Sequence, residues 1–356
     1  MPPAGTGPAP QGPDLPRLAG DLSRVRDRVV KELTLDDPAI EDALQHLVRH
    51  PGKFLRPALV LGAADLLGAD APASEQVVTA GAAVELLHLA TLCHDDLCDR
   101  AGVRRGVPTV NARYGDSAAL VLGDYLLATA LGLAATLGPE AAAAAAHCAR
   151  RICVGQLVEL RETGDPDRSV PGYLAAVSGK TAELLSFSAQ LGAIAAGADE
   201  GRRRALAAFG HHLGVAFQIW NDLGDLTAPG EGAGRDLGNA VYTLPVLFGL
   251  ETAGDRLRPL LSTPDQNHDQ NHDRTVAEVL AVLRDCGALQ RAADTAGARL
   301  RTAFDCLEAA DLPRPAGVPA LRRMLAGLLP EVAQLLDAPP GTAGSARTAR
   351  PAKAAG

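Results

Sequence analysis

An all-α fold is predicted for this chain of 356 residues by its composition and its apolar pattern. Hydrophobic residues make up 47% of the chain but aromatic residues only 3%, and alanine and leucine outnumber the β-branched residues that favour strands. The apolar residues recur at helical spacing over long segments. A chain of this length can bury a large core, and we expect one helical domain rather than two.

The two ends of the chain differ from its middle. Residues 1–20 and 338–356 are rich in proline, glycine and alanine and have no periodic apolar face, so both are predicted to be flexible. The helical domain is expected at 21–337, with a polar insertion at about 262–273 that repeats "DQNH". Within it we expect about ten helices, at roughly 21–49, 55–68, 74–98, 116–137, 139–163, 171–197, 199–227, 240–261, 274–309 and 317–336.

Charge and cysteine usage exclude several classes of protein. The net charge of -8 argues against a nucleic-acid surface. The six cysteines lie in apolar helical patterns without metal-type spacing and no signal peptide is recognised, so we expect buried free thiols and a cytoplasmic location. The segment "SAALVLGDYLLATALGLAATLG" is long enough to span a membrane, but Asp124 interrupts it and a core helix is the better interpretation.

Three carboxylates end one predicted helix, in "LCHDDLCD". Residues four apart share a helix face, so Asp95 and Asp99 stack with Asp96 beside them. A hard divalent cation would relieve their repulsion, and Mg²⁺ prefers a few carboxylates together with the oxygens of a phosphorylated substrate. A solvated helix terminus is the alternative interpretation of this segment alone.

A second oxygen-rich face follows another apolar run, in "QIWNDLGD". Asn221 and Asp225 are four residues apart, with Asp222 between them. If the two faces oppose one another across a cavity, they can hold several Mg²⁺ ions around one diphosphate. The chemistry that such a site favours is ionisation of a carbon to oxygen bond.

Basic residues near these motifs are candidate diphosphate ligands, because arginine offers a planar fork and lysine a point charge. Each alone is more often a surface charge. His88 lies on an apolar face, where a lone histidine is more often a core residue. The candidates are Lys53, Arg56, Arg104, Arg105 and Lys180, with Thr181 beside the last.

Together these segments resemble the trans-isoprenyl diphosphate synthase (polyprenyl synthetase) family. The matching pieces, over about residues 50–250, are "GKFLRP", "ELLHLATLCHDDLCD", "VRRGVPTVNARYGDSAALVLGDYLLA", "GKTAELL", "FQIWNDLGD" and "GRDLGNAVYTLP". The resemblance implies an antiparallel helical bundle around a central apolar cavity, and a homodimer. It also implies Mg²⁺-assisted ionisation of an allylic diphosphate, attack by isopentenyl diphosphate, and loss of a proton.

The resemblance assigns roles to individual residues. Asp95, Asp96, Lys180, Thr181 and Gln218 are expected to be catalytic. The metal ligands implied are Asp95, Asp96, Asp99, Asn221, Asp222 and Asp225. Lys53, Arg56, His88 and Arg105 match the ligands of isopentenyl diphosphate, whereas Arg104, Lys180, Thr181 and Gln218 match groups that contact the allylic diphosphate or support proton removal.

Departures from the family pattern concentrate in the second half of the site. Asn221 replaces the usual first aspartate, and Gln156 stands where glutamate is common. Glu231 and Val241 occupy the positions of two lysines, for which Arg235 is close enough to substitute. These changes weaken the predicted hold on the allylic diphosphate more than the hold on the metals.

Small residues precede the first motif where short-chain members of the family tend to carry an aromatic plug. Ala90 and Thr91, with Leu87 deeper on the helix, therefore predict a twenty-carbon product or a longer one.

Two alternatives stay open from the sequence: a terpene cyclase, for which "NDLGD" is a poor match, and a weakly active subunit or cargo protein that acts with a partner. Docking through the N-terminal arm and product release at a membrane surface are further expectations.

Overall fold

The all-α prediction is confirmed by the computed structural model, which describes residues 15–49, 52–69, 72–227, 234–261 and 270–329. The α-helices among these residues are α1 Leu15–Glu32, α2 Pro38–Arg49, α3 Leu55–Leu66, α4 Glu75–Cys98, α5 Val110–Tyr114, α6 Asp116–Thr136, α7 Pro139–Glu162, α8 Val170–Val177, α9 Glu183–Ala195, α10 Glu200–Thr227, α11 Arg235–Gly238, α12 Leu244–Leu261, α13 Gln270–Asp285, α14 Ala288–Glu308 and α15 Val318–Leu328. The remaining elements are strands β1 Val103–Arg104 and β2 Val107–Pro108, a π-helical turn at Ser178–Ala182 and a 3-10 turn at Pro315–Gly317.

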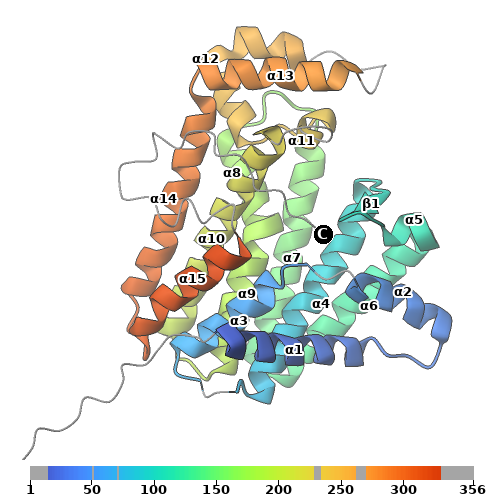
Figure 1. Ribbon diagram of the computed structural model, residues 1–356, viewed down its shortest axis with the longest axis vertical. Coiled ribbons are helices and arrows are strands. Elements are labelled where there is room, and N and C mark those ends of the chain that lie inside the picture. The colour runs from blue at the N-terminus through green and yellow to red at the C-terminus, as the bar shows by residue number, and fades with distance from the viewer. Residues whose placement is uncertain (1–14, 50–51, 70–71, 228–233, 262–269, 330–356) are drawn as a thin grey trace, which may run out of the picture.

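The long helices α4, α7, α9 and α10 run side by side through the middle of the molecule (Figure 1). Helix α4 packs against α3, α6 and α9, and α10 packs against α9 and α14. Helices α12 and α13 lie across one end of this bundle, whereas α1 lies across the other (Figure 1). The central helices therefore have neighbours on several sides, and the positions of their ends are fixed by packing.

Helix α4 shows how the sequence builds the centre of the bundle. Ser74 caps its first turn by accepting a hydrogen bond from the backbone N–H of Val77 at 3.3 Å. The helix is buried along most of its length, because its first five turns carry alanine, valine and leucine on all faces. Its last turn carries several carboxylates, and the packing of the helix holds these carboxylates at the end of the core.

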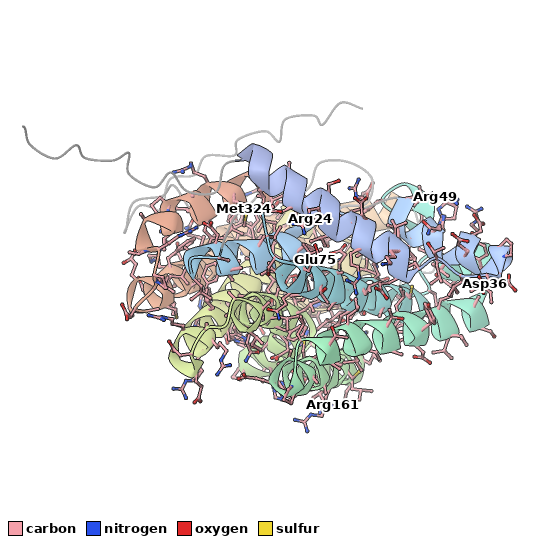
Figure 2. The ribbon with its side chains drawn as sticks, turned by 90° about the horizontal axis from the view of Figure 1, so that it is seen from below. Arg24, Asp36, Arg49, Glu75, Arg161 and Met324 are labelled. Carbon is pink, nitrogen blue, oxygen red and sulfur yellow. The ribbon has the colours of Figure 1, made fainter. Side chains whose placement is uncertain are left out.

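Helix α1 begins at Leu15, so residues 15–20 are helical and the predicted flexible arm was too long. Arg24 ties this helix to the bundle: its guanidinium donates to the carbonyl of Ala73 at 2.6 Å and pairs with Glu75 at the start of α4 (Figure 2). The rest of the predicted arm, the C-terminal tail and most of the polar insertion lie outside the described residues. Residues 270–273 of that insertion open α13.

Three predicted helices are interrupted, each for a local reason, and the helix expected at 240–261 also kinks at Ala253, whose φ of -137° is not helical. The helix expected at 21–49 breaks before Pro38, which starts α2 because its fixed φ suits a first helical turn. The helix expected at 274–309 breaks at Gly287, whose φ of 76° only glycine adopts readily. The helix expected at 171–197 contains the π-helical turn at Ser178–Ala182. Such turns occur often at functional sites, and this one carries Lys180 and Thr181.

A β-hairpin that the sequence analysis missed follows α4. Strands β1 and β2 pair antiparallel around the dipeptide Arg105–Gly106, and both of these residues have positive φ, at 53° and 79°. This is the backbone that a two-residue hairpin turn requires. The hairpin brings the predicted basic pair, Arg104 and Arg105, back toward the end of α4.

All six cysteines are free, as expected. The expectation that they are buried holds for Cys93 and Cys148 but is wrong for Cys98 and Cys153, which are exposed. These two lie on helix turns that no neighbouring helix covers, and an apolar sequence context alone does not reveal such a turn.

Replacement of Gly192 by alanine should destabilise the fold. A Cβ at Gly192 would lie 2.4 Å from the carbonyl oxygen of Val60, so α3 and α9 would have to separate. We expect the free energy of unfolding, measured by urea titration, to fall by about 1–3 kcal/mol. Gly132→Ala is the matched control, since nothing lies within 4 Å of a Cβ there, and it should stabilise α6 slightly. Equal effects of the two changes would contradict the close helix contact.

Candidate active site

The end of α4 holds the first set of predicted metal ligands. Asp95 is half-buried, Asp96 is buried, and Asp99 is the exposed residue at the C-terminal end of the helix. Arg104 of the hairpin donates from both Nε and Nη2 to one carboxylate oxygen of Asp96, each at 2.7 Å. A predicted diphosphate ligand is thus paired with a predicted metal ligand. Asp95 has no such partner on the hairpin among the ion pairs of the described residues.

Lys180 lies between α4 and α7. Its ammonium group donates to the carboxylate of Glu159 and is 4.0 Å from Asp95. Burial lowers the pKa of Lys180, but the two carboxylates outweigh that effect and raise it overall. Lys180 is therefore held as a cation. The sequence analysis missed Glu159, although it lies one turn after Gln156 on the same helix face.

A chain of hydrogen bonds links the π-helical turn to α10. The hydroxyl of Thr181 donates to Oε1 of Gln218 at 2.8 Å, and Nε2 of Gln218 donates to Oδ1 of Asp222 at 2.8 Å. The other oxygen of Asp222 accepts from the hydroxyl of Tyr173. The chain fixes the orientation of the Gln218 amide, because its oxygen faces a donor and its nitrogen faces an acceptor. Tyr173 is a further residue that the sequence analysis did not identify.

Burial raises the pKa of Asp222 to about 7. The hydrogen bonds from Tyr173 and Gln218 oppose this shift, whereas the nearby carboxylates of Asp236 and Glu159 add to it. The pKa of Asp236 is raised to about 6 by burial and by the same kind of repulsion, and that of Asp95 to about 6 chiefly by burial. The site therefore contains more buried negative charge than the described cations neutralise.

The residues of the second predicted motif lie in different surroundings. Asp222 faces the site, but Asn221 is exposed. Asp225 accepts a hydrogen bond from the backbone N–H of Asp236 at 3.1 Å and lies 3.5 Å from Nε of Arg235. Asp225 thus anchors α11. The side chain of Arg235 is 78% exposed and rests on Asp225, so it does not take the place of either missing lysine in this structure.

Five of the predicted residues line one cavity of about 340 Å³. They are Lys180, Thr181, Gln218 and Asp222, and Asp99 contributes from the end of α4. Gln156 also lines the cavity, and both its amide nitrogen and its amide oxygen are buried without a hydrogen-bond partner. Buried polar atoms of this kind are rare in folded proteins unless a ligand or water satisfies them.

A second cluster, of cationic groups, lies further down α4. Burial lowers the pKa of Arg56 to about 10, and burial together with the positive charges of Arg56 and Arg105 lowers that of His88 well below its usual range. Nε of Arg56 and Nδ1 of His88 are buried without a partner. Glu85, one turn before His88, is only 4% exposed and was missed by the sequence analysis. Burial raises its pKa to about 7, although Arg56 and Arg105 oppose the shift.

The loop before α3 and the tip of the hairpin meet at this cluster. A Cβ on Gly52 would lie 2.7 Å from a guanidinium nitrogen of Arg105, which places Lys53 in the same neighbourhood. Phe54 and Arg105 both have left-handed backbone, with φ of 52° and 53°. Residues other than glycine rarely adopt this conformation, and such strain gathers at functional sites. Lys53, Arg56, His88 and Arg105 are thus gathered around one end of α3, and their binding of isopentenyl diphosphate stays a prediction.

The residues predicted to set product length lie in the core of α4. Leu87 and Ala90 are each 2% exposed, and Thr91 donates its hydroxyl to the carbonyl of His88 at 2.7 Å. The hydroxyl of Thr91 is therefore satisfied within its own helix. Their influence on product length stays a prediction.

Among the described residues, no three acidic, histidine or cysteine side chains converge into a ready-made metal site. The oxygen donors nevertheless fit a hard divalent cation. Burial raises the pKa values of Asp95, Asp222 and Asp236, and neighbouring carboxylates add to each shift. Mg²⁺ bound with a diphosphate needs only one or two carboxylates per ion, since phosphate oxygens and water complete its shell.

Comparison with known proteins gives one consistent result. The sequence model of the family described as polyprenyl synthetase matches residues 37–282. A nonaprenyl diphosphate synthase of Mycobacterium tuberculosis is 37% identical over 280 residues, which cover 77% of this chain and 82% of that protein. A heptaprenyl diphosphate synthase component 2 of Geobacillus stearothermophilus is 35% identical over 271 residues, or 75% of this chain and 81% of that protein. The crystal structure of a decaprenyl diphosphate synthase from Rhodobacter capsulatus superposes with a TM-score of 0.80 at 30% identity, covering 88% of this chain and 97% of that one.

Asp222→Asn should flatten the pH dependence of stability in EDTA. Asp222 has a pKa of about 7 in the folded chain against an ordinary value of 3.8, so between these values only the unfolded chain loses the proton. The free energy of unfolding of the wild type therefore falls as pH rises through this window, by on the order of 4 kcal/mol. Urea titrations at pH 4 to 8 measure the slope. Asp311→Asn, at a fully exposed side chain, is the control. An unchanged slope in Asp222→Asn would contradict the buried carboxyl.

Proposed function

We propose a specific division of labour in the active site of this chain, which belongs to the polyprenyl synthetase family. The enzyme is a prenyltransferase that condenses an allylic diphosphate with isopentenyl diphosphate into a linear polyprenyl diphosphate of twenty carbons or more. One observation carries the proposal. Two separate sets of buried, incompletely paired polar groups flank α4, and each can take one diphosphate.

The cavity beside Lys180 receives the allylic diphosphate. In the reaction, the bond between the allylic carbon and its oxygen breaks and the electron pair leaves with the diphosphate. Lys180 balances the charge that develops on the leaving group, and Thr181 and Gln218 orient it through their fixed hydrogen-bonding groups. The apolar residues of the bundle keep water from the cation.

The cluster at Arg56 and His88 receives isopentenyl diphosphate. Arg56 and Arg105 supply charge-assisted hydrogen bonds to its phosphates, Lys53 adds a point charge, and the buried Nδ1 of His88 offers a partner to a phosphate oxygen or hydroxyl. The double bond of isopentenyl diphosphate attacks the allylic carbon, and the released diphosphate in the neighbouring cavity then accepts a proton from the new chain. Glu85 offsets the positive charge of the cluster between turnovers.

Mg²⁺ is the cofactor that these residues fit. Asp95, Asp96 and Asp99 on one side, and Asp222 with Asn221 and Asp225 on the other, are the side chains that would hold it. When bound, the ions neutralise the diphosphate and make it a better leaving group. Asp222 must lose its proton to act as a Mg²⁺ ligand, and a divalent cation favours the ionised carboxylate.

The homodimer is proposed from the surface of α6 and α7. These helices are joined by a short turn and pack against one another. By length and composition α6 could cross a membrane, and only 39% of its most apolar window is buried. The large apolar side chains exposed on this pair are Leu120, Val121, Val154, Leu157 and Leu160. A second copy of the chain, which presents the same apolar face, would cover them.

Purified enzyme with Mg²⁺, isopentenyl diphosphate and dimethylallyl, geranyl, farnesyl or geranylgeranyl diphosphate should make longer linear diphosphates, identified by mass spectrometry of the products. Hydrocarbon formed from an allylic diphosphate alone would instead show a cyclase. No product with any starter would refute the proposal for the isolated chain. That result would favour a subunit that needs a partner, as the relative named component 2 suggests for its own system.

Asp95→Ala tests the proposed mechanism in the same assay. It should lower kcat by at least about 10²-fold, because it removes both a metal ligand and a partner of Lys180. Asp294→Ala is the matched control: this carboxylate is exposed on α14, and its amide partner Gln290 lies on the same helix. Removal of Mg²⁺ with EDTA should abolish turnover of the wild type.

Leu157→Glu should dissociate the dimer. Sedimentation velocity is expected to give twice the chain mass of 36.7 kDa for the wild type and the single mass for the variant. Val103→Glu is matched in exposure, since both side chains are 65% exposed, but it lies on the hairpin and should leave the dimer intact. A monomeric wild type that binds lipid vesicles would overturn the dimer proposal in favour of a membrane surface.

A further inference from the structure

Arg168 is a buried arginine at the wall of the cavity that holds Lys180 and Asp222. It lies in the loop between α7 and α8, and its side chain is only 3% exposed. Nε donates to Glu162 at 2.8 Å, and Nη1 donates to the carbonyl of Tyr242 at 3.4 Å. Its carbon Cζ also lies 5.4 Å from the centroid of the Tyr173 ring. Two hydrogen bonds and this ring contact fix the orientation of the guanidinium, although a wholly buried position is unusual for arginine.

The second terminal nitrogen of Arg168, Nη2, has no partner. It is buried and makes no hydrogen bond to any described residue. Arginine cannot lose its charge inside a protein, so an unsatisfied N–H on a buried guanidinium is costly. Because the residue lines the cavity, an anionic ligand in that cavity is the natural acceptor.

The residue at position 241 explains why the unpaired Nη2 of Arg168 matters for ligand binding. Val241 lines the same cavity, and it stands where the family pattern places a lysine. The carbonyl that Arg168 contacts belongs to Tyr242, the next residue in the chain. The loop of Arg168 is also joined to this segment by a hydrogen bond from the N–H of Gly164 to the carbonyl of Ala240, at 2.8 Å. Arg168 thus places its charge beside the position from which the lysine is missing.

We propose that Arg168 binds the allylic diphosphate in place of the lysine that position 241 lacks. The inference rests on the proposed function, because it assigns a ligand to the same cavity. Glu162 holds Nε, and the unpaired Nη2 at the edge of the planar guanidinium then donates to phosphate oxygens. The sequence analysis found the missing lysine but named Arg235 as its replacement, because Arg168 is distant in sequence and only the fold brings it to position 241.

Arg168→Met should raise the KM for the allylic diphosphate by about 10- to 100-fold, the range expected when a charge-assisted hydrogen bond is lost. The KM for isopentenyl diphosphate should stay within about twofold, because its site lies on the other side of α4. Arg161→Met is the matched control. Arg161 pairs with the other oxygen of Glu162 at 2.9 Å, but its side chain is 72% exposed and projects away from the molecule (Figure 2). It should change neither KM.

A rescue separates binding from folding. Val241→Lys, added to Arg168→Met, should restore most of the lost affinity for the allylic diphosphate, because it returns a cation to the same place. Equal changes in both KM values, or a failure of Val241→Lys to restore affinity in a variant that keeps the wild-type melting temperature, would overturn the proposal and leave Arg168 a structural residue.

Direct binding distinguishes this inference from the proposed function. Isothermal titration with inorganic pyrophosphate, with and without Mg²⁺, measures occupation of the cavity without turnover. The Mg²⁺-dependent part of that binding should weaken about tenfold or more in Arg168→Met and be unchanged in Arg161→Met. If the wild type elongates no starter, the proposed function fails, yet this titration still decides whether Arg168 holds a diphosphate. Unchanged binding in Arg168→Met would refute the role of Arg168 alone.

Discussion

The site depends on one constraint: its charged groups are held in place at the ends of apolar helices. Helix α4 is buried along most of its length, and its packing against α3, α6 and α9 fixes the position of Asp95 and Asp96 at its end. Because these carboxylates cannot turn freely toward water, their charges must be balanced within the protein or by a ligand. Burial and neighbouring carboxylates raise the pKa values of Asp95 and Asp222, and the surrounding cations and hydrogen-bond donors offset these effects only in part.

That incomplete balance explains why negative and positive groups alternate around the cavity. Lys180 is shared between Asp95 and Glu159, and Arg104 is committed to Asp96. A complex of metal and diphosphate carries both positive and negative charge. Its metal can therefore pair with the carboxylates while its phosphates pair with the cations. Electrostatic groups that are already oriented in this way need little reorganisation when the leaving group departs.

Sequence periodicity was sufficient to predict the helices and the residues that share a helix face with a motif. The pairs Asp95 with Asp99 and Asn221 with Asp225 follow from spacing alone, whereas the hydrogen bond between Gln218 and Asp222 is seen only in the structure. Glu85 and Glu159 share helix faces with His88 and Gln156, but spacing does not reveal that their charged neighbours Arg56 and Lys180 come from other elements. Arg168 could not be found by helical spacing, since it lies in a loop. Local breaks were missed for a different reason. The π-helical turn and the two-residue hairpin depend on backbone geometry that short apolar patterns do not record.

The departures from the family pattern also look different in three dimensions. Read along the chain, Val241 and Asn221 suggest a site that has lost part of its charge. In the fold, Val241 faces the same cavity as Arg168, and Asp222 is linked through Gln218 to the turn that carries Lys180. A diphosphate responds to the position and orientation of charge, not to the helix that supplies it. Loss of a lysine at one position therefore predicts loss of binding only where no other cation reaches the same space, and in this enzyme a buried arginine does.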